Sequence, residues 1–168
     1  MSVTFYSPAP IPADERARSE AVRASGLLER VEDPALTALA KSARKLLGGD
    51  WAGVALLVDD LQIVIASSGG QLGRYDRARS MSAHAIVAPE QVFCVSDTIT
   101  DSTFRSNPFV RVGLIRSFVA APIVDAAGYA LGVVCVSSRN PRVPLGDAEA
   151  RSFRSLAAQV LAPPAAGR

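Results

Sequence analysis

The clearest hydrophobic pattern in the chain lies between residues 34 and 47. Apolar side chains recur there with helical spacing, at Leu36, Leu39, Ala40, Ala43, Leu46 and Leu47. Asp33-Pro34 favours a helix start, because Asp accepts from free backbone N–H groups and Pro at the first position has none to leave unpaired. Gly48-Gly49 then ends the helix. The pattern predicts an amphipathic helix over 34–47, with further helices over 14–30 and 147–161.

Two β-branched runs, 51–58 and 61–67, are separated by Asp59-Asp60, and this composition predicts an antiparallel hairpin. Three more strands are predicted over 91–96, 115–124 and 129–137. The rest is a polar connection at 68–79, a short helical piece at 82–87, and a folded loop at 97–114 with inward-facing aromatics. Helices at both ends and strands between them indicate an antiparallel sheet with helices packed against it.

The ends of the chain differ from this central region. Pro8, Pro10 and Pro12 disfavour helix over residues 1–13, which are expected to form an extended arm. Residues 14–162 are predicted to form a single domain, and Pro163-Pro164 opens a flexible tail over 163–168.

Composition narrows the classes of partner. The 18 basic and 16 acidic residues are scattered, so nucleic acid is not an expected partner. No stretch approaches the roughly 20 apolar residues that span a bilayer, and no signal peptide is recognisable, so we expect no membrane association and a cytoplasmic location. Cys94 and Cys135 lie inside apolar runs rather than at metal-ligand spacing, which indicates reduced, buried thiols and no metal site.

Three stretches carry a family resemblance. They are Ser80-Met81-Ser82-Ala83-His84-Ala85-Ile86; Val95-Ser96-Asp97-Thr98 continued by Asp101, Phe104 and Asn107-Pro108; and Phe118-Val119-Ala120-Ala121-Pro122-Ile123 continued by Gly128 and Leu131-Gly132-Val133-Val134-Cys135-Val136. In order and spacing the chain resembles bacterial GAF domains, in particular the signalling subtype associated with histidine kinases and diguanylate cyclases.

The resemblance implies an α+β fold. A central antiparallel sheet of about six strands would carry the terminal helices on one face and a mixed helix/loop crossover over a pocket on the other. It also implies a homodimer formed through the terminal helices and a histidine kinase or cyclase as partner. The expected function is regulatory: a small molecule, not identified by the sequence, binds without covalent attachment, or the domain dimerises, or both.

The candidate pocket is bounded by the crossover. Its expected lining residues are Ser82, His84, Phe93, Asp97, Phe104, Phe109, Phe118 and Ala120. Apolar walls with a few polar groups suit a small organic ligand. His84 is the only histidine, and a hydrogen-bonding structural role competes with a ligand-binding one. Bilin-binding relatives attach the chromophore through a Cys directly before this His. Here Ser82 and Ala83 precede it, which argues against a covalent bilin and leaves the cofactor unknown.

Other functions remain open at this stage. A degenerate GAF scaffold that dimerises without a ligand fits the same motifs. A thiol-dependent free-methionine-sulfoxide reductase would use Cys94 or Cys135, but no basic residue adjoins either thiol in the sequence to lower its pKa. Asp97 and Asp101 can be interpreted as an acid–base pair, or as a strand end and a helix cap. We predict no catalytic residue and a protein that is not an enzyme. A free-standing protein and a fragment of a larger sensor both fit the sequence.

Overall fold

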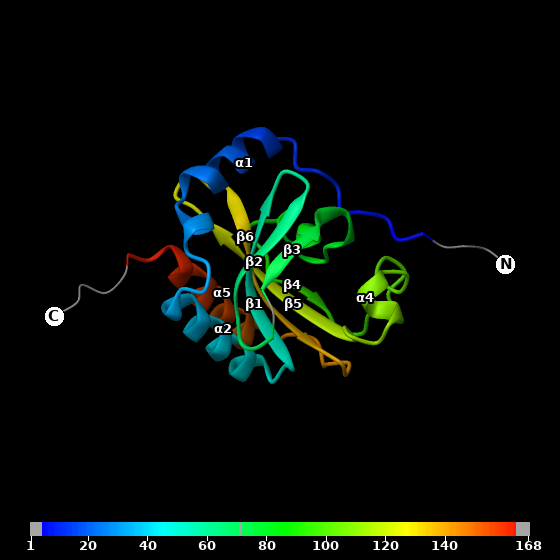
Figure 1. Cartoon of the computed structure of the whole chain (residues 1–168). Coiled ribbons are helices and arrows are strands. Elements are labelled where there is room, and N and C mark those ends of the chain that lie inside the picture. The colour runs from blue at the N-terminus through cyan, green and yellow to red at the C-terminus, as the bar shows by residue number, and fades with distance from the viewer. Residues whose placement is uncertain (1–4, 71, 164–168) are drawn as a thin grey trace.

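A six-stranded antiparallel sheet forms the middle layer of the computed structural model, which describes residues 5–70 and 72–163 (Figure 1). The strands are β1 (Trp51–Val58), β2 (Leu61–Ser67), β3 (Gly73–Asp76), β4 (Phe93–Val95), β5 (Ser117–Val124) and β6 (Ala130–Ser138). Their order across the sheet is β3-β2-β1-β6-β5-β4. The predicted α+β fold and the β1–β2 hairpin are confirmed.

Helices α1 (Glu15–Ala24), α2 (Pro34–Leu47) and α5 (Asp147–Ala158) pack on one face of the sheet (Figure 1). Short helices α3 (Ser82–Ala85) and α4 (Pro108–Arg111) lie in the crossover on the other face. Three-residue 3-10 turns occur at Leu27–Glu29, Arg77–Arg79 and Gln159–Leu161. In the part of the chain that the structure describes, no helix is long and apolar enough to cross a bilayer.

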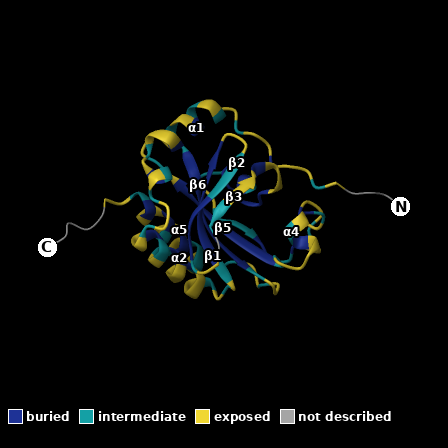
Figure 2. Ribbon diagram, in the orientation of Figure 1, coloured by how far each residue is buried: buried dark blue, intermediate teal, exposed yellow. Residues whose placement is uncertain are grey.

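The strands β1, β5 and β6 are buried on both faces and are dark in Figure 2, whereas the edge strand β3 is mostly exposed. Along β1, Val54, Leu56 and Val58 join the core under the helices, whereas Ala55 and Leu57 join a second core under the crossover. Alternate side chains of a strand point to opposite faces. A strand with apolar residues at every position therefore supplies both cores.

Gly132 explains why β6 can lie tightly against β1. A Cβ built at Gly132 would come within 2.0 Å of the backbone oxygen of Ala55, which is far inside van der Waals contact. Only a residue without a side chain permits this approach.

An ionic network fastens α1 to the sheet. The buried guanidinium of Arg18 donates to the carbonyls of Ala130 and Leu57, at 2.9 and 2.6 Å, and to both carboxylate oxygens of Glu15 at 2.8 Å. Glu15 also pairs with Arg77, which follows β3. One carboxylate therefore bridges two buried cations, one on the helix and one beyond the edge strand.

Several local predictions need correction. The predicted connection 68–79 contains β3, which pairs with β2 through Gln62 opposite Tyr75 and Ile63 opposite Arg74. The predicted helix 14–30 is broken at Gly26, whose φ of +79° suits a residue without a Cβ. The short helix is confined to α3, and the predicted helix 147–161 ends in a 3-10 turn.

The N-terminal arm has no regular secondary structure over 5–12, and its extended conformation stays a prediction. Tyr6 and Ala9 nevertheless pack into the core beneath the crossover. Residues 1–4 of the predicted arm and 164–168 of the predicted tail lie outside the described residues.

Candidate functional site

A cavity opens between the sheet and the crossover, and strand pairing sets its floor. Phe118 of β5 lies opposite Ser137 of β6, which in turn lies opposite Trp51 of β1. The next row on the same face contains Ala120, Cys135 and Gly53. The first row has an aromatic side chain at each end and Ser137 between them, and the second row has only small side chains. The floor is therefore lowest between Trp51 and Phe118.

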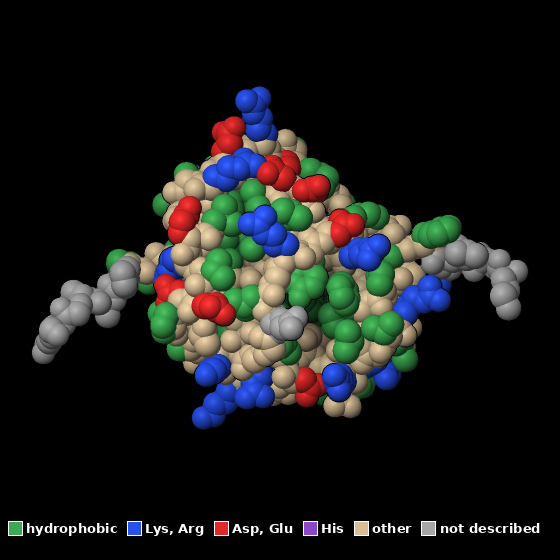
Figure 3. Space-filling view, in the orientation of Figure 1, with side chains coloured by type: hydrophobic (Ala, Val, Ile, Leu, Met, Phe, Trp, Pro, Cys, Tyr) green, Lys and Arg blue, Asp and Glu red, His purple; other side chains and the backbone are tan. Residues whose placement is uncertain are grey.

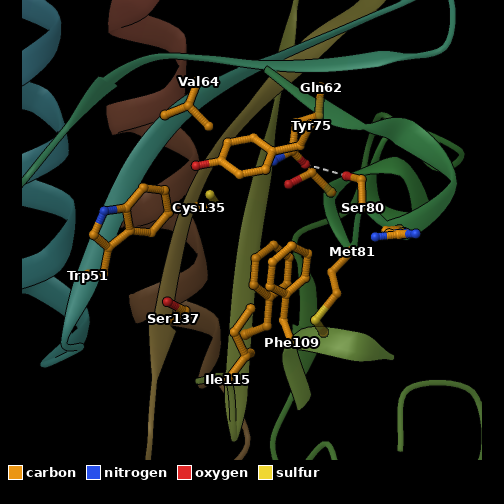
Figure 4. Close-up of a pocket in the computed structure, with 13 residues that line it drawn as sticks. Trp51, Gln62, Val64, Tyr75, Ser80, Met81, Phe109, Ile115, Cys135 and Ser137 are labelled. Carbon is orange, nitrogen blue, oxygen red and sulfur yellow. Dashed lines mark hydrogen bonds between the residues drawn. The ribbon is translucent and has the colours of Figure 1, made fainter. Parts of the chain in front are cut away.

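Aromatic rings enclose the space above this floor. The cavity has a volume of 150 Å³ and is lined by Trp51, Gln62, Val64, Tyr75, Arg79, Ser80, Met81, Ser82, Phe109, Ile115, Phe118, Cys135 and Ser137. Tyr75 meets Phe109 edge to face, with ring centroids 6.4 Å apart. Figure 4 shows the rings of Trp51, Tyr75 and Phe109 arranged around this space.

Trp51 is held as a fixed wall. Its indole Nε1 donates to the carbonyl of Gly69 at 2.9 Å. The ring covers Gly53, where a built Cβ would stand 2.4 Å from the indole carbon Cη2. Glycine at position 53 therefore makes room for the indole to lie on the sheet.

Asn107 connects the crossover to the opposite wall. Its buried side chain accepts from the backbone N–H of Phe109 at 3.0 Å and donates to the carbonyl of Arg79, also at 3.0 Å. Asn before Pro108 is a favourable helix start, for the reasons given for Asp33-Pro34. The cap of α4 thereby positions Phe109 relative to the wall formed by residues 79–82.

Two pairs of polar groups in the cavity, Ser80 with Gln62 and Ser82 with Cys135, form hydrogen bonds. Ser80 donates to the amide oxygen of Gln62 and accepts from the N–H of Ala83 at 3.2 Å (Figure 4). Burial raises the pKa of Cys135 to about 12, although a hydrogen bond with Ser82 acts in the opposite direction. The cavity therefore contains a protonated thiol and no carboxylate side chain among its lining residues.

A second, larger hollow adjoins the cavity. It has a volume of 580 Å³ and is lined by Asp50, Trp51, Gly69, Gly70, Phe109, Leu114, Ile115, Ser137 and Arg139. Trp51, Phe109, Ile115 and Ser137 line both spaces, and these four shared residues are called the neck. Figure 3 shows hydrophobic side chains gathered around a depression in this face, over the region between β2, β3 and α4.

Of the eight residues predicted for the pocket, the cavity brings together Ser82, Phe109 and Phe118. Ala120 is buried in β5, on the same face. The remaining four, His84, Phe93, Asp97 and Phe104, lie outside the cavity lining. A ligand role for the eight residues stays a prediction.

His84, Phe93 and Phe104 form an aromatic cluster beside the cavity. His84 and Phe104 are edge to face with centroids 4.8 Å apart, and Tyr6 of the arm closes the group through a 2.8 Å hydrogen bond between its Oη and His84 Nε2. Burial lowers the pKa of His84 and raises that of Tyr6 to about 12, so both are neutral near pH 7. Phe93 also contacts Phe118, which links this cluster to the cavity wall.

Asp97 lies on the loop after β4. It accepts from Arg116 at 2.6 and 3.0 Å, and this bidentate pair lowers the pKa of Asp97. Asp101 instead accepts from the backbone N–H of Thr103 at 2.8 Å, in the manner of a turn cap. Both carboxylates are engaged in local structure, which matches the strand-end and cap interpretation of the sequence.

Sequence reasoning missed most of the cavity lining. The cross-strand rows were the available signal, because assigning Phe118 and Ala120 to one face also assigns Ser137 and Cys135 to it once β5 and β6 are paired. Trp51 follows from pairing β1 with β6. Tyr75 had no such signal, because β3 was not recognised.

Neither thiol nor metal chemistry finds support in the arrangement. Cys94 packs against the core under the helices and Cys135 belongs to the core under the crossover, so the two thiols lie on opposite faces of the sheet. Direct exchange between them is excluded by this separation. Within residues 5–70 and 72–163, no group of three or more His, Cys, Asp or Glu side chains is placed to hold a metal ion.

The sequence matches the GAF domain family over residues 32–162, most of the chain. The chain belongs to the GAF domain family. This GAF domain is a signalling module, as the resemblance implied.

Its relatives include a cyclic di-GMP phosphodiesterase of Pseudomonas aeruginosa, which is 33% identical over 154 residues; these cover 91% of this chain and 26% of the relative. This chain thus spans about a quarter of the length of that protein. Among solved structures, the blue-light-absorbing form of the PixJ GAF domain of Thermosynechococcus elongatus has a TM-score of 0.61 at 16% identity, with 90% of this chain and 89% of that chain covered.

A domain of a putative two-component sensor histidine kinase from Sinorhizobium meliloti has a TM-score of 0.53 at 17% identity, covering 73% of this chain and 83% of that one. At such identities, the likeness to both solved structures shows the shared fold.

The prediction that the protein is not an enzyme is contradicted by its relatives. A relative at 33% identity is named a cyclic di-GMP phosphodiesterase, so the sequence has enzymatic relatives.

Proposed function

We propose that this GAF domain binds a small organic molecule without covalent attachment and transmits its presence to a signalling partner. The 150 Å³ cavity between the sheet and the crossover carries the proposal. Its walls are aromatic and apolar, with a few polar groups at fixed positions, which is the composition of ligand sites in general. A cavity of roughly this volume holds a benzene-sized molecule.

The route for the signal would run through the layers of the fold. The wall over residues 79–82 begins two residues after Arg77, and Arg77 pairs with Glu15 of α1. A ligand that displaces this wall would shift the contact that fixes α1 to the sheet. Binding matters only if it stabilises one arrangement more than the other.

The partner remains a proposal as well. The phosphodiesterase relative makes enzymes of cyclic di-GMP turnover the first class to test, followed by histidine kinases.

Pairing of two copies through the terminal helices would carry the output. Sedimentation equilibrium tests it: Leu46→Glu, on the half-exposed side of α2, should dissociate a dimer that Val31→Glu leaves intact.

A fragment screen by thermal shift, with a filled-cavity variant as reference, tests binding. Val64→Phe places a ring in the cavity from β2, whereas Val124→Phe adds the same ring at the exposed end of β5. Circular dichroism verifies that both variants fold. We expect fragments that stabilise the wild type and Val124→Phe but not Val64→Phe. If no fragment separates the two variants, the ligand-free scaffold is the better interpretation.

A further inference from the structure

The cavity and its neighbouring hollow differ in character although they share a neck. The inner cavity is small and surrounded by rings, whereas the outer hollow has nearly four times its volume and contains Asp50 and Arg139. A molecule that fills both must have a compact apolar end and a longer polar end. Trp51 lines both spaces, and its hydrogen bond to the carbonyl of Gly69 fixes one side of the neck.

The outer hollow is lined by one acid, Asp50, and one base, Arg139, which differ in their hydrogen-bond partners. The Asp50 carboxylate already accepts from the Ser138 hydroxyl at 3.0 Å and from the backbone N–H of Arg139 at 2.7 Å. The exposed guanidinium of Arg139 forms no ion pair with any of the described residues. The Asp50 carboxylate is therefore engaged by local donors, and the charge of Arg139 helps to lower its pKa without a direct ion pair. The guanidinium N–H groups of Arg139 remain available, and a guanidinium binds carboxylates well.

We propose that the ligand is an aryl acid: a single flat ring in the inner cavity and a short chain through the Trp51–Phe109 neck to an anionic group at Arg139. This proposal rests on the proposed function and specifies its ligand class. The ring would lie among Trp51, Tyr75 and Phe109, where edge and face contacts favour an aromatic ring over a saturated one.

Trp51 is the only tryptophan in the chain, so its fluorescence reports on the neck directly. Benzoate, phenylacetate, phenylpropionate and phenylbutyrate, titrated in turn, vary the chain length between ring and carboxylate. We expect affinity to rise along the series until the carboxylate reaches Arg139. Cyclohexylpropionate should bind at least about threefold more weakly than phenylpropionate, because it lacks the aromatic contacts. Equal or tighter binding of the saturated ring would overturn the aryl assignment.

Arg139→Gln tests the charged end. Phenylpropionate should bind about tenfold more weakly, the usual scale of one charge-assisted hydrogen bond, and uncharged phenylpropanol should change less than about twofold. Arg151→Gln on α5, which packs on the opposite face, is the matched control and should leave both affinities unchanged.

Two results contradict the placement of the anion. If Arg139→Gln weakens phenylpropionate and phenylpropanol equally, Arg139 does not bind the carboxylate. If phenylpropionate loses affinity only in Arg79→Gln, the carboxylate binds in the inner cavity, which Arg79 lines. If the fragment screen finds cavity binders that are not aryl acids, the ligand class is wrong while ligand binding itself stands. If nothing binds, both proposals fail.

Discussion

Replacing Glu15 with Gln removes one negative charge from the contact between α1 and the sheet while keeping the shape of the side chain. Arg18 and Arg77, whose side chains are only 2% and 5% exposed, would then lose their shared carboxylate. Each would keep backbone carbonyl partners: Leu57 and Ala130 for Arg18, Asp59 for Arg77. The variant therefore isolates the charge from the packing.

The cost follows from the pKa of Glu15. Burial alone would raise this pKa, but the hydrogen bonds and charges of Arg18 and Arg77 outweigh it and lower the value from 4.5 to about 2. A shift of this size corresponds to about 3 kcal/mol at ~1.4 kcal/mol per unit. Because the carboxylate keeps 20% of its surface in water, screening reduces the figure, and we expect about 2 kcal/mol.

Urea unfolding followed by Trp51 fluorescence and circular dichroism measures the loss. Glu20→Gln is the matched control, since Glu20 meets Arg16 at 3.5 Å with both side chains mostly exposed, and it should cost under about 0.5 kcal/mol. The folded-state pKa of Glu15 is the depressed one, so its contribution is complete above pH 4.5 and is lost as pH falls toward 2. The gap between wild type and Glu15→Gln should close over that window. A gap that persists at pH 2, or a Glu20→Gln cost of equal size, would refute the ionic explanation.

Three further predictions concern packing and reactivity. Gly132→Ala should cost more than about 3 kcal/mol or prevent folding, because its Cβ meets backbone, whereas Gly146→Ala, in open space, should change unfolding by under about 0.5 kcal/mol in the same urea assay. Tyr6→Phe should cost about 1 kcal/mol through the lost hydrogen bond to the His84 ring; no change in the urea midpoint would contradict its role. Native protein at pH 8 should react with a thiol reagent at Cys94 and not at Cys135, whose pKa is about 12, and mass spectrometry of the labelled peptides identifies the site.

Helix α2 and the β1–β2 hairpin could be predicted from the sequence, whereas strand β3 could not. Helix α2 was predicted to its last residue because its periodicity, the Asp33 cap and the Gly48 stop agree. The β1–β2 hairpin follows from two apolar runs and a turn. Strand β3 was missed because its four residues are mostly exposed and polar, and only their pairing with β2 makes them a strand.

The site was harder to predict for a physical reason. Ser82, Phe109 and Phe118 were found because they belong to recognisable motifs. Whether a side chain faces the cavity or the neighbouring aromatic cluster depends on the three-dimensional path of the crossover, which local sequence does not determine. For His84 the sequence left a ligand role and a structural hydrogen-bonding role open, and its hydrogen bond to Tyr6 of the arm is a long-range contact that no local pattern encodes.

That contact also determines how the domain would bear a mechanical load. The segment from Tyr6 to Glu15 is fastened at one end to the aromatic cluster under the crossover and at the other, through Arg18 and Arg77, to the helix side of the sheet. The arm and the end of α5 lie on opposite sides of the molecule (Figure 1). Tension applied between them would load the Tyr6–His84 contact before it reached α1. Breaking that contact first would protect the packing of α1 on the sheet.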